Sequence, residues 1–396
     1  MDIVRFDAGS SKLPRVRISA LPTFSFRSVQ LRRQGCTPEQ KSDTRHRWYS
    51  RSRYALTDAL RACGVGPNAA VLIPAYHCRT MVDPGLRLNT TVQLYSLHRD
   101  LTVDFAALES LLNKCQPQPV ALLAVHFFGI QQDMSRLQAL CQSYGITLIE
   151  DCSHCFWHPS MRDQLGRVGR YSIWSPYKFY PCEDGGILQA NDGASLPSST
   201  SLNPPWRKEA EGVYRLLNRS RKQIQTADQA FVSAAIDQAA GSDIPLGQDL
   251  VEWRPGPSDQ YVSAAEHCQP LAVSRWIIRY ADTERIRNSR RARYSAWANL
   301  VASFSGCRPL YSSLPNNCVP YMFPLQVDQP DRPFRLLKRL GFPVWRWDNM
   351  VVSACKVAHD YRSQVFQLPC HQELSGAEFS WMLHALGSVL HNATTK

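Results

Sequence analysis

The chain alternates short, continuous apolar runs with segments in which apolar residues recur at helical spacing. The apolar runs lie at Ala69–Pro74, Val92–Leu97, Val120–Gly129 and Ile146–His154, and the helical segments at Tyr54–Gly64, Phe105–Cys115 and Met134–Gly145. Such runs are typical of strands that are buried on both faces, and glycine is a common helix stop. The repeated order of strand and helix predicts an α/β fold with a mostly parallel central sheet and helices on both faces.

Outside this region the pattern is less regular. Residues 241–260 are rich in Gly, Pro and Asp, which is typical of a linker. We expect a helix from Trp206 to Gln225 and a long helix from Leu271 to about Phe304, followed by shorter strands and helices. The expected organisation is an irregular N-terminal segment (1–45), a large domain (46–245) and a small C-terminal α/β domain (246–396).

The chain of 396 residues carries a formal net charge of +12. Much of the positive charge lies in short clusters, such as Arg45, Arg47, Arg51 and Arg53, or Arg287, Arg290, Arg291 and Arg293. Nucleic-acid binding is one interpretation, but no zinc-finger spacing or RNA-binding signature accompanies the charge. A basic surface that attracts phosphorylated or nucleotide-linked substrates and a solvated helix face are the alternatives. We expect no nucleic-acid partner.

The thirteen cysteines are scattered without regular spacing. A chain of this length does not need disulfides, so we interpret them as reduced thiols of a cytoplasmic protein. Cys152 and Cys155 form a C-S-H-C sequence, but a zinc or redox site needs further ligands or a different context, so no metal is expected. Residues 1–17 lack the apolar core of a secretory signal, and no long apolar run occurs. We therefore expect no contact with a membrane.

Three residues carry the candidate chemistry. Asp151 ends a buried run, where a carboxylate is costly unless it is paired. A protonated pyridine nitrogen would be such a partner, and a helix N-cap is the simpler alternative. His154 would stand beside a bound aromatic group or serve as an ordinary core histidine. Lys178 lies between aromatic residues and prolines in SPYKFYP, a dry setting that makes an amine nucleophilic toward an aldehyde, although most such lysines only reach the surface.

The order of the motifs resembles the DegT/DnrJ/EryC1/StrS aminotransferase family, which consists of pyridoxal-phosphate enzymes with the aspartate aminotransferase fold. The motifs are YAL (54–56), LIPAYHC (72–78), VHFFG (125–129), EDCSH (150–154), SPYK (175–178) and EDGG (183–186). The resemblance is close over residues 50–190 and looser elsewhere, so the chain is identified as a divergent member. It implies the PLP-dependent transferase fold of type I and pyridoxal 5′-phosphate as cofactor.

The resemblance also implies roles for single residues. Lys178 would hold the cofactor as a Schiff base and then move protons between cofactor and substrate. Asp151 would pair with the pyridine nitrogen, and His154 would lie near the ring hydroxyl. Ser175, and with it Ser172, would contact the phosphate.

Two segments depart from the family pattern. Family members usually carry Ser-Gly-Thr where this chain has SRSRYAL, so Ser52 and Arg53 are the candidates for binding the phosphate, with Arg53 as a mere surface cation equally plausible. The residue that stacks on the cofactor ring should lie just after Pro74. Counting places Cys78 where an aromatic residue is usual, so Tyr76 or His77 would stack instead, and we favour Tyr76.

The resulting expectation is a PLP-dependent aminotransferase with small-molecule substrates. It would move an amino group from an amino acid to a keto group of a nucleotide-linked sugar or a secondary-metabolite intermediate. A PLP-dependent lyase or dehydratase and a non-catalytic family member are the alternatives. Active sites of this fold usually lie at a dimer interface, so the resemblance implies a homodimer, and polysaccharide biosynthesis is a family-level expectation.

Overall fold

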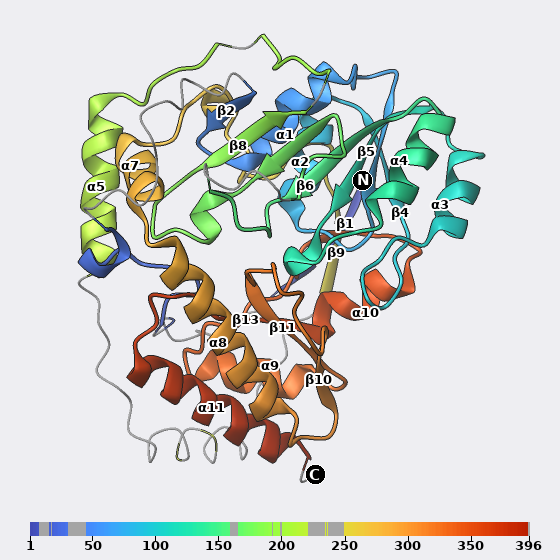
Figure 1. Cartoon of the computed structure of the whole chain (residues 1–396). Coiled ribbons are helices and arrows are strands. Elements are labelled where there is room, and N and C mark those ends of the chain that lie inside the picture. Colours follow the sequence, from blue (N-terminus) through green and yellow to red (C-terminus); the bar gives the residue numbers. More distant parts are fainter. Residues whose placement is uncertain are drawn as a thin grey trace.

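A seven-stranded sheet dominates the upper part of the molecule in Figure 1. The computed structural model describes residues 1–7, 16, 18–30, 45–158, 165–191, 193–198, 200–220, 234, 236 and 249–394. In sheet order, the strands are β2 (His46–Tyr49), β8 (Gly186–Ala190), β7 (Tyr171–Trp174), β6 (Thr147–Cys152), β5 (Pro119–Val125), β3 (Ala70–Pro74) and β4 (Thr91–Tyr95). The neighbours from β7 to β4 are parallel, whereas β8 is antiparallel to both β7 and β2. The expected mostly parallel sheet is confirmed.

Helices cover both faces of this sheet. Helices α1 (Ser52–Ala62) and α2 (Arg79–Arg87) lie on one face, and α3 (Phe105–Leu112) and α4 (Met134–Ser143) lie on the other (Figure 1). The chain moves from β3 to β4 in one direction along the sheet and then back to β5 and β6. Because parallel crossovers are right-handed, this reversal places the connecting helices on opposite faces.

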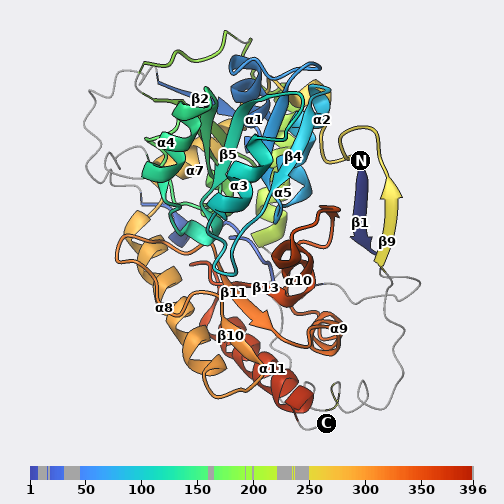
Figure 2. The same cartoon turned by 90° about the vertical axis from the view of Figure 1, so that its right-hand side faces the viewer.

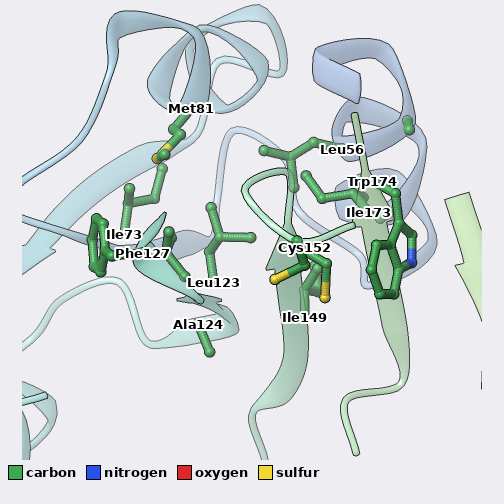
Figure 3. Packing of buried hydrophobic residues seen from close by; sticks show 14 of the residues in the cluster. Leu56, Ile73, Met81, Leu123, Ala124, Phe127, Ile149, Cys152, Ile173 and Trp174 are labelled. Atoms are coloured by element: carbon green, nitrogen blue, oxygen red, sulfur yellow. The ribbon is translucent and has the colours of Figure 1, made fainter. Parts of the chain in front are cut away.

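The main core lies between the sheet and its helices. Figure 3 shows Met81 of α2 pointing toward Ile73 of β3, and Leu56 of α1 pointing toward Ile173 of β7. All four side chains are buried. Strands that are covered on both faces need apolar side chains at every position, which explains the continuous apolar runs of the sequence.

The reversal of strand order falls between β3 and β5. In open α/β sheets, ligands bind beyond the carboxyl ends of the strands at such a switch point. The segments that follow β3, β5, β6 and β7 therefore define the edge where a site is expected.

A second, smaller sheet lies below the first in Figure 1, in the order β10 (Cys307–Pro309), β11 (Met322–Val327) and β13 (Val365–Pro369). Its core includes Trp297 and Phe323. The helices of this part are α8 (Thr283–Val301), α9 (Asp331–Arg339), α10 (Lys356–Gln364) and α11 (Gly376–Thr394). Helices α5 (Trp206–Ser220) and α7 (Ala272–Tyr280) pack together beside the large sheet. Among the helices described, none is both long and apolar enough to span a bilayer.

The N-terminal segment differs from the expectation of an irregular chain. Strand β1 (Asp2–Phe6) pairs with β9 (Asp249–Trp253) and β12 (Met350–Val351), and Figure 2 shows β1 and β9 side by side. Both partners are more than 200 residues away along the chain. A strand of five residues whose partners are so distant gives no local signal of its pairing.

The expected long helix from Leu271 to about Phe304 is also wrong, because it is two helices. Ala281 leaves the helical region with ψ at 147°, and the Asp282 side chain caps α8 by accepting a hydrogen bond from the N–H of Arg285. An aspartate before a helical segment is a start signal that the sequence already contained. The last residues of the helix expected up to Gln225 and the domain boundary expected at 245/246 lie outside the described residues.

Candidate active site

The carboxyl ends of β6 and β7 bring the main candidate residues to one edge of the sheet. Asp151 pairs in register with Ile173, and Cys152 with Trp174. Ser175 follows β7 directly, and Lys178 ends the short 3-10 helix Pro176–Lys178. The order of the motifs along the sequence thus becomes proximity in space.

Lys178 is half-buried, and its amine points into an aromatic environment. Its Nζ lies 5.1 Å from the centre of the Tyr321 ring. Among the described residues, no carboxylate pairs with this amine.

Asp151 and its neighbour Glu150 are both buried but differ in their partners. The Glu150 carboxylate accepts four hydrogen bonds, from Nε2 of His126 and from the N–H groups of Gly166, Val168 and Gly169, at 2.7–3.2 Å. Asp151 Oδ1 accepts one hydrogen bond, from the N–H of Ser153 at 2.8 Å. In the described part of the chain, no cationic side chain forms an ion pair with Asp151.

The partners of Glu150 explain why this buried carboxyl group is ionised. Burial alone would raise its pKa, but the hydrogen bond from His126 and those from the N–H groups of Gly169 and Val168 outweigh burial and lower the pKa. Nδ1 of His126 accepts the N–H of Gln132 at 3.2 Å, so Nε2 carries the proton that is donated to Glu150. His126, Glu150 and Cys152 lie close enough together to resemble a metal site, but these hydrogen bonds account for both the imidazole and the carboxylate.

His154 is fully enclosed and lies next to Lys178. Its ring stacks on Tyr321 with a centroid distance of 4.5 Å and an interplanar angle of 24°. Nδ1 accepts the N–H of Phe128 at 3.2 Å. Burial, and then the positive charge of Lys178, hold the pKa of His154 well below its usual value, so the ring is neutral.

A pair of hydroxyl groups lies at the N-terminus of α1. Ser52 Oγ and Ser175 Oγ are 2.5 Å apart, although they are 123 residues apart in sequence. The close approach requires Gly186, because a side chain there would run into the main chain of Arg51 and Ser52. The N–H of Gly185, at φ +144°, donates to the carbonyl of Ser50. A helix N-terminus with two hydroxyls is suited to hold a phosphate.

The two arginines that flank Ser52 point in different directions. The Arg53 guanidinium donates to the main-chain carbonyl of Gln260. Arg51 instead lies 4.5 Å above the centre of the Tyr177 ring, between Ser175 and Lys178 along the chain. Arg51 is therefore the arginine that faces the segment between Ser175 and Lys178, and the motifs of the sequence did not point to it.

Tyr76 and His77, the two candidates for stacking on a cofactor ring, are each packed against residues other than Lys178. Tyr76 is fully buried against Trp347, with a centroid distance of 4.6 Å. His77 is fully buried as well, with Nδ1 3.1 Å from the carbonyl of Cys78 and Nε2 3.4 Å from the N–H of Val351. Both nitrogens of His77 are thus occupied by the main chain, and burial lowers its pKa to about 4. The structure does not bring His77 to the lysine.

Tyr321 and Trp347 are the residues that sequence reasoning missed. Tyr321 stacks on His154, and Trp347 lies 5.7 Å from the same ring. Both come from the C-terminal third of the chain, where the family motifs are weak. The only signal was the aromatic character of VPYMFP and VWRWD, which predicts burial rather than a place beside Lys178.

The fold is that of solved aminotransferases. The aminotransferase TlmJ of Streptoalloteichus hindustanus matches 89% of this chain with a TM-score of 0.59 and 17% identity, over 87% of its own length. NtdA of Bacillus subtilis, solved with bound cofactor PMP, matches 87% of this chain with a TM-score of 0.57 and 16% identity, over 73% of its own length. At these identities the comparison shows the fold alone, and it confirms the expected fold class.

Sequence comparison identifies the family. The model of the DegT/DnrJ/EryC1/StrS aminotransferase family matches residues 51–204. UDP-N-acetyl-3-dehydro-alpha-D-glucosamine 3-aminotransferase of Acidithiobacillus ferrooxidans is 28% identical over 36% of this chain and 37% of its own length. The erythromycin biosynthesis sensory transduction protein EryC1 of Saccharopolyspora erythraea is 27% identical over 50% of this chain and 51% of its own length. The resemblance seen in the motifs is confirmed: over residues 51–204 the chain is similar to this family. The matches span about a third to a half of these curated relatives.

Proposed function

We propose that the chain binds pyridoxal 5′-phosphate at this edge of the sheet and acts as an aminotransferase. One observation carries the proposal: Asp151 and Lys178 lie at the same strand ends, and within the described ranges the buried carboxylate has no cation partner and the amine has no carboxylate partner. Each is costly in an otherwise apolar setting. A cofactor with a protonated ring nitrogen and an aldehyde satisfies both, and the Ser52–Ser175 hydroxyl pair suits its phosphate.

The proposed roles follow from these positions. When bound, the cofactor supplies an aldehyde that condenses with amines and a ring that accepts electron density from the substrate. Asp151 holds a positive charge at the ring nitrogen, and Ser52 and Ser175 hold the phosphate. Lys178 would hold the cofactor through Nζ, and the same amine would carry a proton to and from the substrate carbon. Neutral His154 accepts or donates hydrogen bonds beside the ring without adding charge.

The substrate proposal rests on the relatives. One is named for transfer of an amino group to a UDP-linked 3-dehydro sugar, and another belongs to erythromycin biosynthesis. We therefore propose an amino-acid donor and the keto group of a nucleotide-linked sugar, or of a related secondary-metabolite or polysaccharide intermediate, as acceptor. Small-molecule chemistry of this kind accords with a site at the sheet edge.

We also propose that the chain works as a homodimer in the cytoplasm. Helix α5 exposes apolar side chains on its surface, including Trp206 at 74% and Tyr214 at 68% exposure, which a second copy would cover. The twelve cysteines in the described part of the chain are free thiols, which supports a reducing compartment. Light scattering of the purified protein measures its oligomeric state directly.

The test is cofactor binding followed by amine transfer. Wild-type protein, Lys178→Ala and the surface control Lys114→Ala are mixed with pyridoxal phosphate, reduced with borohydride and digested. We expect a visible absorbance band and a cofactor mass on the peptide containing Lys178 in wild type and Lys114→Ala only. A mass that persists in Lys178→Ala would remove Lys178 from its role.

Turnover separates the candidate reactions. Amino donors are tested against a panel of keto acids and keto sugars, with the new amine followed by mass spectrometry. Amine transfer supports the proposal, and elimination without transfer supports the lyase alternative. Cofactor binding without either reaction, across the full panel, supports a non-catalytic family member.

A further inference from the structure

Three of the four arginines clustered on α8, namely Arg290, Arg291 and Arg293, are directed at main-chain carbonyl groups. Arg291 donates to the carbonyls of Pro315 and Cys318 at 2.7 and 2.6 Å. Arg293 donates to those of His371 and Leu374 at 2.7 and 2.5 Å. These donors hold loops in place, so they are not presented to a phosphate or a nucleic acid.

Arg290 is the fully buried member of this cluster, and its guanidinium connects three separate segments. It donates to five oxygens, namely the carbonyls of Lys178 (3.0 Å), Phe179 (3.4 Å), Pro320 (3.1 Å) and Tyr321 (2.9 Å) and Oε1 of Gln372 (3.0 Å). Nε2 of Gln372 donates in turn to the carbonyl of Phe179 at 2.8 Å. We refer to Arg290 and Gln372 as the clamp.

The charge state of the clamp is fixed by its surroundings. Burial lowers the pKa of Arg290 to about 10, which still leaves the guanidinium protonated at neutral pH. Within the described residues, no carboxylate pairs with it, so the carbonyl dipoles and the Phe179 ring, 4.7 Å away, are its stabilising neighbours. A buried cation that is satisfied by carbonyls alone makes its hydrogen bonds sensitive to the loss of any partner.

Two of the clamped carbonyls belong to residues whose side chains face each other. Lys178 Nζ lies 5.1 Å from the Tyr321 ring centre, and Tyr321 stacks on His154. One guanidinium therefore holds both main chains from which these side chains project. The distance between the amine and the aromatic stack depends on one rigid, planar group rather than on a flexible loop.

We propose that Arg290 is a positioning residue that sets the place of Lys178 Nζ against the Tyr321–His154 stack. Its guanidinium fork fits two carbonyls on each side, and a lysine at this position has neither the planarity nor the donors to replace it. The proposal rests on the proposed function only in assigning the reaction to Lys178. The clamp itself is testable without cofactor.

The first experiment compares Arg290→Met, Arg290→Lys and the matched control Arg291→Met as cofactor-free proteins. Hydrogen exchange of the peptide covering residues 176–182 and the rate of acetylation of Lys178 are measured. We expect both Arg290 variants to raise exchange in this peptide roughly tenfold or more, as expected for the loss of a hydrogen bond to a charged group. Arg291→Met also loses two carbonyl contacts, so it should lower the melting temperature but leave both rates unchanged.

Arg290→Lys decides the outcome if Arg290→Met does not fold, because it keeps the charge and the approximate length. Wild-type exchange and wild-type Lys178 acetylation in Arg290→Lys would overturn the proposal. So would an equal rise in Arg291→Met, because it would show a general loss of stability.

The second experiment uses protein loaded with pyridoxal phosphate. We expect kcat to fall in Arg290→Lys with little change in KM for the acceptor, and the pH of the visible colour change to shift, whereas Arg291→Met retains both. If the wild type binds no cofactor but the Arg290 variants still show faster hydrogen exchange in residues 176–182, the clamp is supported and the proposed function is rejected. Covalent binding at Lys178 with unchanged exchange would do the reverse.

Discussion

The adjacent carboxylates Glu150 and Asp151 should respond in opposite ways to removal of their charge. Glu150 holds the segment that contains Gly166, Val168 and Gly169 and is 1% exposed, so solvent does not screen its hydrogen bonds. Asp151 is equally buried but accepts only the N–H of Ser153 among the contacts described. Glu150 therefore stabilises the fold, whereas the charge of Asp151 lowers the stability of the cofactor-free protein.

The magnitude follows from the donors. In Glu150→Gln, one carboxylate oxygen becomes an NH₂ group, so two of the four donors lose their acceptor and face another donor. At about 1.5–3 kcal/mol for each hydrogen bond to a charged group, the loss is about 3–6 kcal/mol. Asp151→Asn keeps the oxygen that accepts from Ser153 and removes an unpaired buried charge, so the change should be within about 1 kcal/mol or stabilising.

Urea unfolding of the cofactor-free variants, followed by tryptophan fluorescence, measures both values. The difference between wild type and Glu150→Gln should shrink as the pH falls below about 4.5. Because the folded pKa of Glu150 is lowered, its contribution is present above the unfolded pKa and is lost on acidification. Pyridoxal phosphate binding should show the opposite order, with Asp151→Asn impaired and Glu150→Gln retained below its melting temperature. An Asp151→Asn variant as unstable as Glu150→Gln would refute the reasoning.

Three further predictions concern the phosphate cradle and the core. Ser52→Ala and Ser175→Ala should each weaken pyridoxal phosphate binding roughly 10- to 100-fold and leave binding of phosphate-free pyridoxal unchanged, as measured by fluorescence titration. Gly186→Ala should lower both stability and pyridoxal phosphate affinity, because the added Cβ meets the main chain at the start of α1. Gly256→Ala, where the added Cβ has open space, should change neither, and a thermal melt together with the same titration measures both quantities. Burial lowers the pKa of His77 to about 4, so wild type should lose about 1.4 kcal/mol per pH unit between pH 6.5 and 4 relative to His77→Gln in urea titrations, because only the unfolded chain binds that proton.

The large sheet was predictable because its signals are local. Strands β3 and β5 are continuous apolar runs, and α1, α3 and α4 have regular apolar spacing. Strand β1 was not predictable, because its partners β9 and β12 are distant and its five residues carry no pattern of their own. The break between α7 and α8 lay within reach, because Asp282 is an ordinary N-cap that a long helical pattern concealed.

The site was predictable where the chemistry lies in the motifs themselves. Asp151 and His154 lie at and just beyond the end of β6, and Ser175 and Lys178 follow its neighbour β7, so spacing along the sequence translated into proximity. The stacking residue and the phosphate cation remained open, because side-chain direction after a strand is set by tertiary packing. Tyr76 is packed against Trp347, a residue more than 250 positions away, and no feature of LIPAYHC reveals that contact.

The arginines are the clearest case in which the sequence does not reveal the partners of a side chain. A net charge of +12, with arginines gathered in short clusters, raises the question of a polyanionic partner. The fold directs the donors of Arg53 to a carbonyl of Gln260 and those of Arg290 and Arg291 to carbonyls of surrounding loops. The charge still contributes to the field of the molecule and so favours anionic substrates, but donors committed to carbonyls cannot form the phosphate contacts that nucleic-acid affinity requires. The same guanidinium geometry that makes arginine a phosphate ligand also lets it hold loops through their carbonyls, and the sequence alone does not distinguish the two uses.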